Sequence, residues 1–212
     1  MKYGVRFQDS YSRGELLLRT FLGGFYIAIP HGFLLLFVTI ASMFVNFIAF
    51  WAILFTGQFP EKLFNFQVGF QRWNLRVSAR LNNLSDGYPA FGINGQDDNT
   101  IIDIERPEKS NRGTVLLRVM FGGFYVMIPH GFVLLFLMIG VIFVRLISFW
   151  VILITGKHSK GLHDFMTGVS RWQFRVSAYM TYLTDVYPPF SLSGDEATFN
   201  NVRNSEEVLD QF

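Results

Sequence analysis

The sequence predicts an all-α membrane protein made of two tandem, pseudo-symmetric units. Three observations carry the prediction: a 35-residue apolar run, its second occurrence, and an amphipathic segment after each copy. The runs extend from Phe21 to Phe55 and from Met120 to Ile154. The first has no charged side chain and the second has only Arg145. Since about 18 apolar residues in a row already mark a membrane segment, both runs belong in a bilayer.

The repeat sets the domain organisation. A shift of 99 residues aligns Arg13 to Phe91 with Arg112 to Phe190 without a gap, and about half of the aligned positions are identical. Each unit has a basic lead-in, the apolar run, a turn, an amphipathic segment and a closing Asp-x-Tyr-Pro-x-Phe. A tandem duplication is therefore expected. The predicted parts are a cytoplasmic segment (1–12), unit 1 (13–91), a polar linker (92–111), unit 2 (112–190) and an acidic, mobile tail (191–212).

Composition narrows the classes of function. Charged residues make up 16% of the chain, against about 25% in a typical soluble domain. The formal net charge of +2 is too small to indicate a nucleic-acid partner. No cysteine is present, which excludes a disulfide framework and thiolate chemistry. The first 15 residues are polar, so no cleavable signal peptide is expected and the first apolar run serves as its own targeting signal.

The amphipathic segments predict helices at the membrane surface. On a helix at about 100° per residue, Glu61 to Leu84 gathers its apolar side chains within an arc of about 80°, with arginines beside it. Such a helix suits the interface, where each basic residue contributes about 1 kcal/mol on an anionic surface. The alternative is a helix packed on the protein's own membrane segments. The residues predicted to bind lipid headgroups are Arg19, Arg72, Trp73, Arg76, Arg118, Arg171, Trp172 and Arg175.

Two membrane topologies are compatible with each apolar run. Basic residues flank both ends of both runs, so a hairpin with its apex near Ala41 or Gly140 would keep all of them on the cytoplasmic side, with both termini. The alternative is one long crossing that starts at Pro30 or Pro129. A single crossing would place Arg145 near the bilayer centre, at a cost of about 2.5 to 3.5 kcal/mol, so the hairpin is favoured.

A family resemblance rests on both units. The stretches FWAILFTGQFP, FQVGFQRWNLRVSARL and SDGYPAF, with FWVILITGKHS and FMTGVSRWQFRVSAYMTYLTDVYPPF, resemble the bacterial membrane-protein family catalogued as domain of unknown function four-three-eight-nine. The resemblance implies an integral protein of the bacterial cytoplasmic membrane, with tandem domains and no known activity. Unit 1 departs from the pattern at Arg80 and Ala90, where unit 2 has Tyr179 and Pro189. Unit 2 is therefore the better candidate for a binding surface.

Histidines are the only candidate cofactor ligands. His31 and His130 occupy equivalent positions in the IPHGF segments, and one imidazole from each unit would be enough to hold a haem between helices. No carboxylate or thiolate repeats beside them, so a histidine bonded to a backbone carbonyl or a lipid phosphate is the favoured interpretation. His158 and His163 occur in unit 2 only and carry no repeated role. The sequence therefore predicts no cofactor and no metal site.

Two glycine pairs lie early in the runs. Gly23 and Gly24, like Gly122 and Gly123, are small residues that let membrane helices approach closely. They are expected either to pack the units against each other or a partner, or to mark a local bend.

The predicted function is that of a non-enzymatic membrane protein. Asp86 and Asp185 are expected to pair with the arginines or cap a turn, because no partner for acid–base chemistry lies near them. No phosphate loop, His-Glu metal spacing or nucleophile elbow is present in the sequence. We expect an accessory or scaffolding subunit that binds anionic lipid and packs against a partner membrane complex or a second copy. The alternatives are a small transporter or channel subunit and, more weakly, a haem-binding electron-transfer subunit.

Overall fold

Each apolar run forms one continuous bent helix. The computed structural model describes residues 1–194, so nearly all of the predicted mobile tail lies outside the described residues. In unit 1 the helix comprises α1 (Arg13–Gly23), a π-helical turn η1 (Gly24–Ala28) and α2 (Ile29–Thr56). In unit 2 it comprises α4 (Arg112–Gly122), η2 (Gly123–Met127) and α5 (Ile128–Thr155). Both helices are long and apolar enough to cross a membrane, by length and composition.

The hairpin prediction is wrong, because each apolar run forms one continuous bent helix. The alternative of a single membrane crossing stays a prediction. Ala41 and Gly140 lie inside α2 and α5, where no turn interrupts the helix. The physical reason is that a hairpin apex in lipid would leave backbone N–H and C=O groups without partners, whereas a continuous helix satisfies all of them internally.

Local sequence signals fix the ends of both bent helices. Ser12 and Asn111 cap the N-termini, each accepting a hydrogen bond from the backbone N–H three residues further on. Gly57 and Gly156 end the helices with φ angles of 77° and 71°. This left-handed conformation favours glycine and is a common stop signal for helices.

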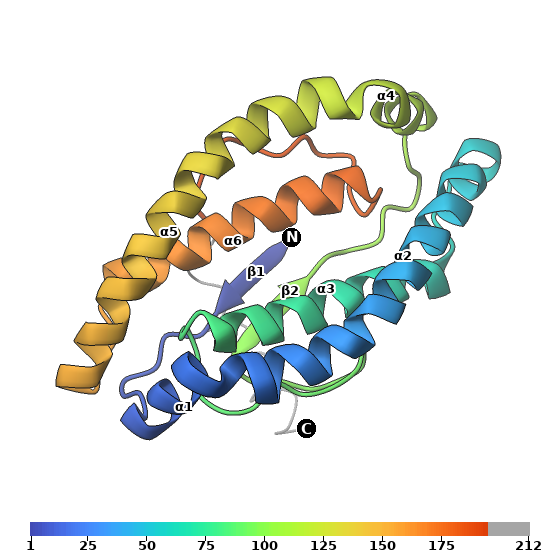
Figure 1. Ribbon diagram of the computed structural model, residues 1–212. Coiled ribbons are helices and arrows are strands. Elements are labelled where there is room, and N and C mark those ends of the chain that lie inside the picture. Colours follow the sequence, from blue (N-terminus) through green and yellow to red (C-terminus); the bar gives the residue numbers. More distant parts are fainter. Residues whose placement is uncertain (195–212) are drawn as a thin grey trace, which may run out of the picture.

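The glycine pairs mark the bend. The π-helical turns begin at Gly24 and Gly123, and such turns are a known cause of sharp kinks. In Figure 1, α4 is seen nearly end-on while α5 runs across the view. A Cβ on Gly23 would lie 3.5 Å from the side chain of Leu81 in its own unit, and one on Gly24 would meet nothing within 4 Å. The bend interpretation is thus supported, and the first pair makes no contact between units.

Two shorter helices and a β-ribbon complete the fold. Helix α3 (Glu61–Leu81) packs along α2, and α6 (Lys160–Met180) packs along α5. The strands β1 (Lys2–Val5) and β2 (Thr100–Asp103) pair antiparallel. These strands lie in the N-terminal segment and the linker, so the all-α prediction missed them.

The β-ribbon lies on a pseudo-two-fold axis that relates the units. Tyr3 pairs with Ile102, and these two residues are 99 positions apart, which is the offset of the repeat. The strand that precedes unit 1 packs on α6 of unit 2, where Arg171 donates to the carbonyl of Tyr3 at 3.0 Å. The strand that precedes unit 2 packs on α3 of unit 1, where Arg72 donates to the carbonyl of Ile102 at 2.8 Å. These two contacts are equivalent under the pseudo-two-fold symmetry.

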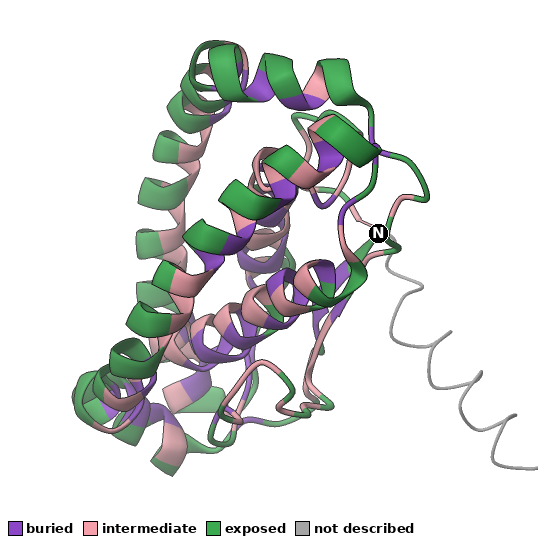
Figure 2. Cartoon of the chain, turned by 90° about the vertical axis from the view of Figure 1, so that its right-hand side faces the viewer, coloured by how far each residue is buried: buried purple, intermediate pink, exposed green. Residues whose placement is uncertain are grey.

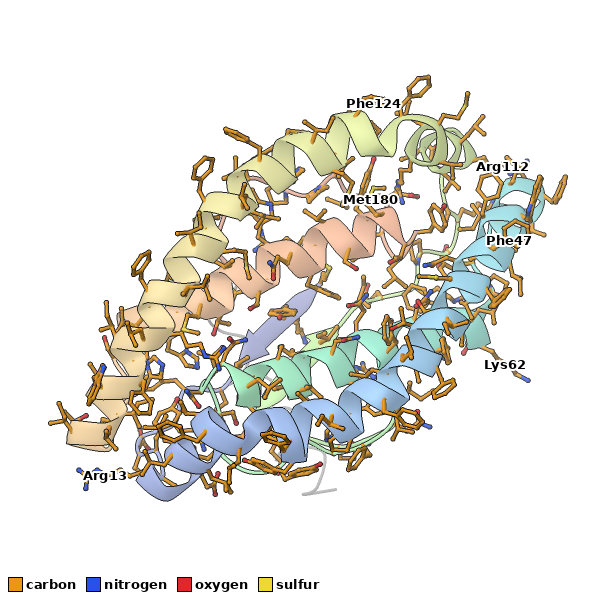
Figure 3. The ribbon with its side chains drawn as sticks, viewed as in Figure 1. Arg13, Phe47, Lys62, Arg112, Phe124 and Met180 are labelled. Carbon is orange, nitrogen blue, oxygen red and sulfur yellow. The ribbon has the colours of Figure 1, made fainter. Side chains whose placement is uncertain are left out.

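The same symmetry makes α2 and α5 antiparallel. Arg13 at the start of α1 donates to the carbonyl of Ile154 at the end of α5, at 2.8 Å. Arg112 at the start of α4 donates to the carbonyl of Phe55 at the end of α2, at 3.0 Å. Figure 3 shows both arginines at opposite corners of the molecule. The beginning of each bent helix therefore meets the end of the other.

The core is shared by the two units. Its buried apolar residues come from α3 (Val68, Leu75) and from α6 (Met166, Phe174), and Gln71 of α3 donates to the hydroxyl of Ser177 at 3.0 Å. The molecule has three layers: the ribbon with the linker, then α3 and α6, then the long helices (Figures 1 and 2).

The long helices leave an apolar face uncovered. In the most apolar window of each, only 11% of the residues are buried, whereas the core helix of a soluble protein is mostly buried. No large apolar side chain of α3 or α6 is exposed. Most of the exposed large apolar side chains lie on the bent helices, and the others belong to Met1 and to the closing segments of the units (Tyr88, Phe91, Val186, Tyr187 and Phe190). We call the exposed surface of the bent helices the apolar face: on α2 it includes Ile29, Phe33, Phe37, Ile40, Phe44, Phe47 and Trp51.

Candidate functional site at the helix bend

The residues of the repeated motifs converge where each long helix bends. In unit 1 the indole N–H of Trp73 on α3 donates to Nδ1 of His31 on α2, at 2.9 Å. The ring of Phe91 stacks on the imidazole, with centroids 3.9 Å apart and planes 4° apart. The hydroxyl of Tyr88 donates to the backbone carbonyl of Tyr26 in η1, at 2.9 Å. This carbonyl lies within the π-helical turn, so the closing segment of the unit is fastened to the bend.

Unit 2 repeats the arrangement. Trp172 donates to Nδ1 of His130 at 2.9 Å, and Phe190 stacks on the imidazole with centroids 4.0 Å apart. The hydroxyl of Tyr187 donates to the carbonyl of Tyr125 at 3.0 Å and also lies 3.1 Å from Nε2 of His130. We call these two groups the bend clusters; they contain Arg19, His31, Trp73, Asp86, Tyr88 and Phe91 in unit 1 and Arg118, His130, Trp172, Asp185, Tyr187 and Phe190 in unit 2.

An ion pair joins the lead-in of each unit to its closing segment. Nη2 of Arg19 lies 2.7 Å from Asp86, and Nη2 of Arg118 lies 2.6 Å from Asp185. Both arginine side chains are buried. Each aspartate also accepts the backbone N–H of the N-cap residue of α1 or α4. The predicted pairing of these aspartates with arginines is confirmed.

The remaining predicted lipid-binding arginines also bond to protein atoms. Arg72 and Arg171 donate to the β-ribbon, as described above. Arg76 donates to the carbonyls of Ala90, Gly92 and Gly95, and Arg175 donates to those of Ser191 and Ser193. These bonds hold the segment after each closing phenylalanine on α3 or α6.

All eight residues predicted to bind lipid thus have partners inside the protein. Trp73 and Trp172 are buried and donate to histidines. The six arginines bond to the aspartates and backbone carbonyls described above. The helices α3 and α6 pack on the protein's own long helices, as the alternative interpretation expected. Lipid binding by these eight residues stays a prediction.

One departure of unit 1 from the motif, Arg80, has a local explanation. Arg80 makes two hydrogen bonds, of 2.6 and 2.7 Å, to the carboxylate of Asp97 in the linker. Burial acts to raise the pKa of Asp97, but the hydrogen bonds from Arg80 and Thr100 outweigh it and leave the pKa lowered. At the equivalent position of unit 2, the hydroxyl of Tyr179 lies 3.0 Å from that of Tyr125. The two units therefore use this position for different contacts.

The structure does not combine the two repeated histidines into one site. The imidazoles of His31 and His130 are each enclosed by aromatic residues of their own unit. Within residues 1–194 no group of three or more His, Asp or Glu side chains is placed to hold a metal ion.

A second histidine pair, to which the sequence assigned no role, lies beyond the end of α5. His158 and His163 are buried, with ring centroids 5.6 Å apart and planes 88° apart. The equivalent residues of unit 1, Phe59 and Phe64, have centroids 5.5 Å apart and planes 90° apart. Burial lowers the pKa of His163 to about 4 and also lowers that of His158. The histidines thus occupy a packing site built for two phenylalanines, as the repeat alignment could have indicated.

Comparison with known families agrees with the repeat. A family model described as Domain of unknown function (DUF4389) matches the chain twice, over residues 16–92 and 112–191. No curated protein and no solved structure matches the chain. The two matched segments cover more than half of the sequence and contain both bend clusters. The chain therefore belongs to the DUF4389 family and carries two tandem copies of its domain.

Proposed function

We propose that the protein is a non-enzymatic membrane scaffold, an accessory subunit that holds acidic lipid and a membrane-protein partner or a second copy. The observation that carries this proposal is the apolar face, where large side chains are exposed along the whole of both long helices. An uncovered apolar surface of that extent in water would drive association, so it needs lipid or another apolar partner. Phe47 and Phe124 point away from the body of the protein in Figure 3 and are 64% and 70% exposed.

The bend clusters support a scaffold. Their polar side chains bond to one another or to the backbone, and they tie together segments from three parts of each unit. Buried, bonded networks of this kind make a structure rigid. A rigid angle between α1 and α2 gives the apolar face a fixed shape on which a partner helix can pack.

We assign the binding of acidic lipid headgroups to basic residues at the rim of the apolar face. Lys62 and Lys157 are exposed beyond the ends of α2 and α5, and Arg13 and Arg112 are exposed at the starts of α1 and α4. Each basic residue near an anionic surface contributes about 1 kcal/mol, so four together give a strong preference for acidic lipid.

Affinity purification in mild detergent, with mass spectrometry of proteins and lipids, tests the proposal. We expect a stoichiometric membrane-protein partner or a second copy, together with retained anionic lipid. The variant Lys62→Gln/Lys157→Gln should retain less anionic lipid. Lys2→Gln/Arg6→Gln removes the same charge from exposed residues at β1, in the layer farthest from the long helices, and serves as the matched control. A protein that purifies alone, as a monomer and without enrichment of anionic lipid, would contradict the proposal.

A further inference from the structure

We propose that the protein inserts into one leaflet from one side, with α2 and α5 lying along the membrane plane instead of crossing it. The proposal rests on the proposed function in one respect, that the apolar face contacts lipid. It adds the orientation of that face.

Helix α2 is closely associated with α3 along their lengths. Near the start of α2, His31 accepts from Trp73; in the middle, the side-chain amide of Gln67 donates to the carbonyl of Ser42 at 3.0 Å and to Asn46 at 2.8 Å. Helix α3 has 21 residues and a length of about 32 Å, nearly the thickness of the hydrocarbon core. If α2 crossed the bilayer, α3 would therefore cross it as well.

The composition of α3 does not allow a crossing. Its exposed residues are Glu61, Lys62, Asn65 and Arg72, and Gln71 lies at its midpoint. A charged side chain at the bilayer centre costs about 2.5 to 3.5 kcal/mol even on the most lenient scales. A helix with one polar side fits the interface between lipid and water. Because α3 lies along the interface, α2 beside it also lies along the membrane plane.

The direction of the short helices also supports this orientation. Helix α4 is nearly end-on in Figure 1 and lengthwise at the top of Figure 2, which is turned by 90°. Helix α5 runs diagonally in Figure 1 and down the left-hand side of Figure 2. In Figure 2 the N-terminus, at the start of the β-ribbon, lies on the side away from α5. Helix α4 therefore runs from the polar side of the molecule towards the apolar face.

The length of the short helices matches one leaflet. Helices α1 and α4 have 11 residues each, about 16 Å, which is half of a 30 Å hydrocarbon core. In the proposed orientation they descend through one leaflet, and the π-helical turns direct the chain into the membrane plane. The pseudo-two-fold axis then stands along the membrane normal. Both units face the bilayer the same way, so the basic residues at both ends of each run lie at the same surface.

The position of Arg145 fits a helix that lies in the membrane plane. This residue is exposed in the middle of α5, in an otherwise apolar stretch. At about 100° per residue it stands at one edge of the exposed arc, whose centre is near Leu146. On a helix that lies in the membrane plane, the edge of the arc faces the headgroups, and a long arginine side chain reaches them. On a crossing helix the same guanidinium would lie in the hydrocarbon.

Single cysteines test the orientation, and the chain has no native cysteine to remove. Asp9→Cys, Gln58→Cys, Lys109→Cys and Lys157→Cys replace exposed residues next to the four helix ends. In sealed vesicles of known orientation, a membrane-impermeant maleimide should label all four from the same side. Because α2 and α5 are antiparallel, one crossing per unit would put Asp9 and Lys157 on one side and Gln58 and Lys109 on the other, and this result would overturn the proposal.

A carbonate wash of the same vesicles distinguishes failure of the one-leaflet orientation from failure of the proposed membrane scaffold. Retention of the protein in the membrane, with labelling from one side, supports both. Retention with labelling split between the sides overturns the one-leaflet orientation and leaves the membrane scaffold intact. Release of the protein into the supernatant overturns both, since the apolar face would then not be embedded.

Discussion

The indole N–H of Trp73 donates to Nδ1 of His31 at 2.9 Å, and the equivalent pair in unit 2, Trp172 and His130, has the same distance. The partners are 42 residues apart in both units. Each bond joins the start of α2 or α5 to the amphipathic helix that runs back along it. Four aromatic or imidazole side chains thus set the spacing of two helix pairs.

Removal of this bond should destabilise the fold. The variant Trp172→Phe keeps most of the ring but leaves Nδ1 of the buried His130 without its donor, which costs about 1 to 3 kcal/mol. We expect a lower midpoint of thermal unfolding in detergent. The matched control is Trp150→Phe, which changes a side chain that is 54% exposed on the apolar face. Equal midpoints for the two variants would show that the indole bond contributes nothing.

The buried ion pair of each bend cluster should contribute more than a surface pair. Asp185→Asn leaves the buried guanidinium of Arg118 without its counter-charge, and loss of one partner of a buried pair costs about 3 to 5 kcal/mol. Asp185 is itself 29% exposed, so we expect the lower end of this range. Asp103→Asn breaks the exposed pair with Lys2 and should cost about 1 kcal/mol or less. Chemical denaturation of both variants measures the difference, and similar losses would refute the assignment.

Stability should fall in mildly acidic solution because of His158 and His163. The unfolded chain titrates near pH 6.5, whereas burial holds the pKa of His163 at about 4. Between these values the unfolded state binds more protons, so the stabilisation is complete above about pH 6.5 and is lost as the pH falls towards 4, by about 3 kcal/mol at pH 4. The groups facing His163 are Asp164, with its carboxylate 3.6 Å from Nδ1, together with Lys160, His158 and the ring of Phe7.

A swap between the units provides the control for this pH dependence. His158→Phe/His163→Phe installs the pair that unit 1 uses, and its unfolding midpoint should vary less between pH 7 and pH 4.5 than that of the parent. The converse variant, Phe59→His/Phe64→His, should vary more. If the slope with pH were the same in all three proteins, the histidine pair would not be its cause.

The close approach of the linker to α3 gives a further prediction. A Cβ added at Gly69 would lie 2.8 Å from the carbonyl oxygen of Ile93, which is closer than real contacts allow. Gly69→Ala should therefore displace the linker and increase proteolysis within it. Gly32→Ala on α2 is the control, because its Cβ would meet nothing within 4 Å. Unchanged proteolysis of Gly69→Ala would mean that the linker is not held on α3.

The sequence predicts the parts of the fold that depend on long patterns. Two apolar runs, an alignment at a 99-residue offset and an amphipathic period were enough for the long helices, the tandem units and the following helices. The strands Lys2–Val5 and Thr100–Asp103 have four residues each and lie in polar segments, so no pattern identified them. The glycine pairs are compatible with a bend or with close helix packing, and the sequence does not distinguish the two.

The partners of the polar residues were less predictable. The helical periodicity of the sequence places Arg76 beside an apolar face. It cannot show that the guanidinium donates hydrogen bonds to backbone carbonyls 14 to 19 residues further along the chain. The contact between Trp73 and His31 depends on the turn between α2 and α3, which sets the register of two helices. Basic residues at both ends of each run favour a hairpin on sequence alone. The proposed helix in the membrane plane satisfies the same observation without an apex.

The depth of α2 in the bilayer tests the central claim most directly. Ile29, Ile40 and Trp51 are exposed, are 11 residues apart and lie on nearly the same face of the helix. Spin labels at cysteines in these three positions, with oxygen and a polar nickel complex as relaxation agents, report depth. If α2 lies in the membrane plane, all three labels have similar depths. A profile with Ile40 at the bilayer centre and both other labels near opposite headgroups would contradict it.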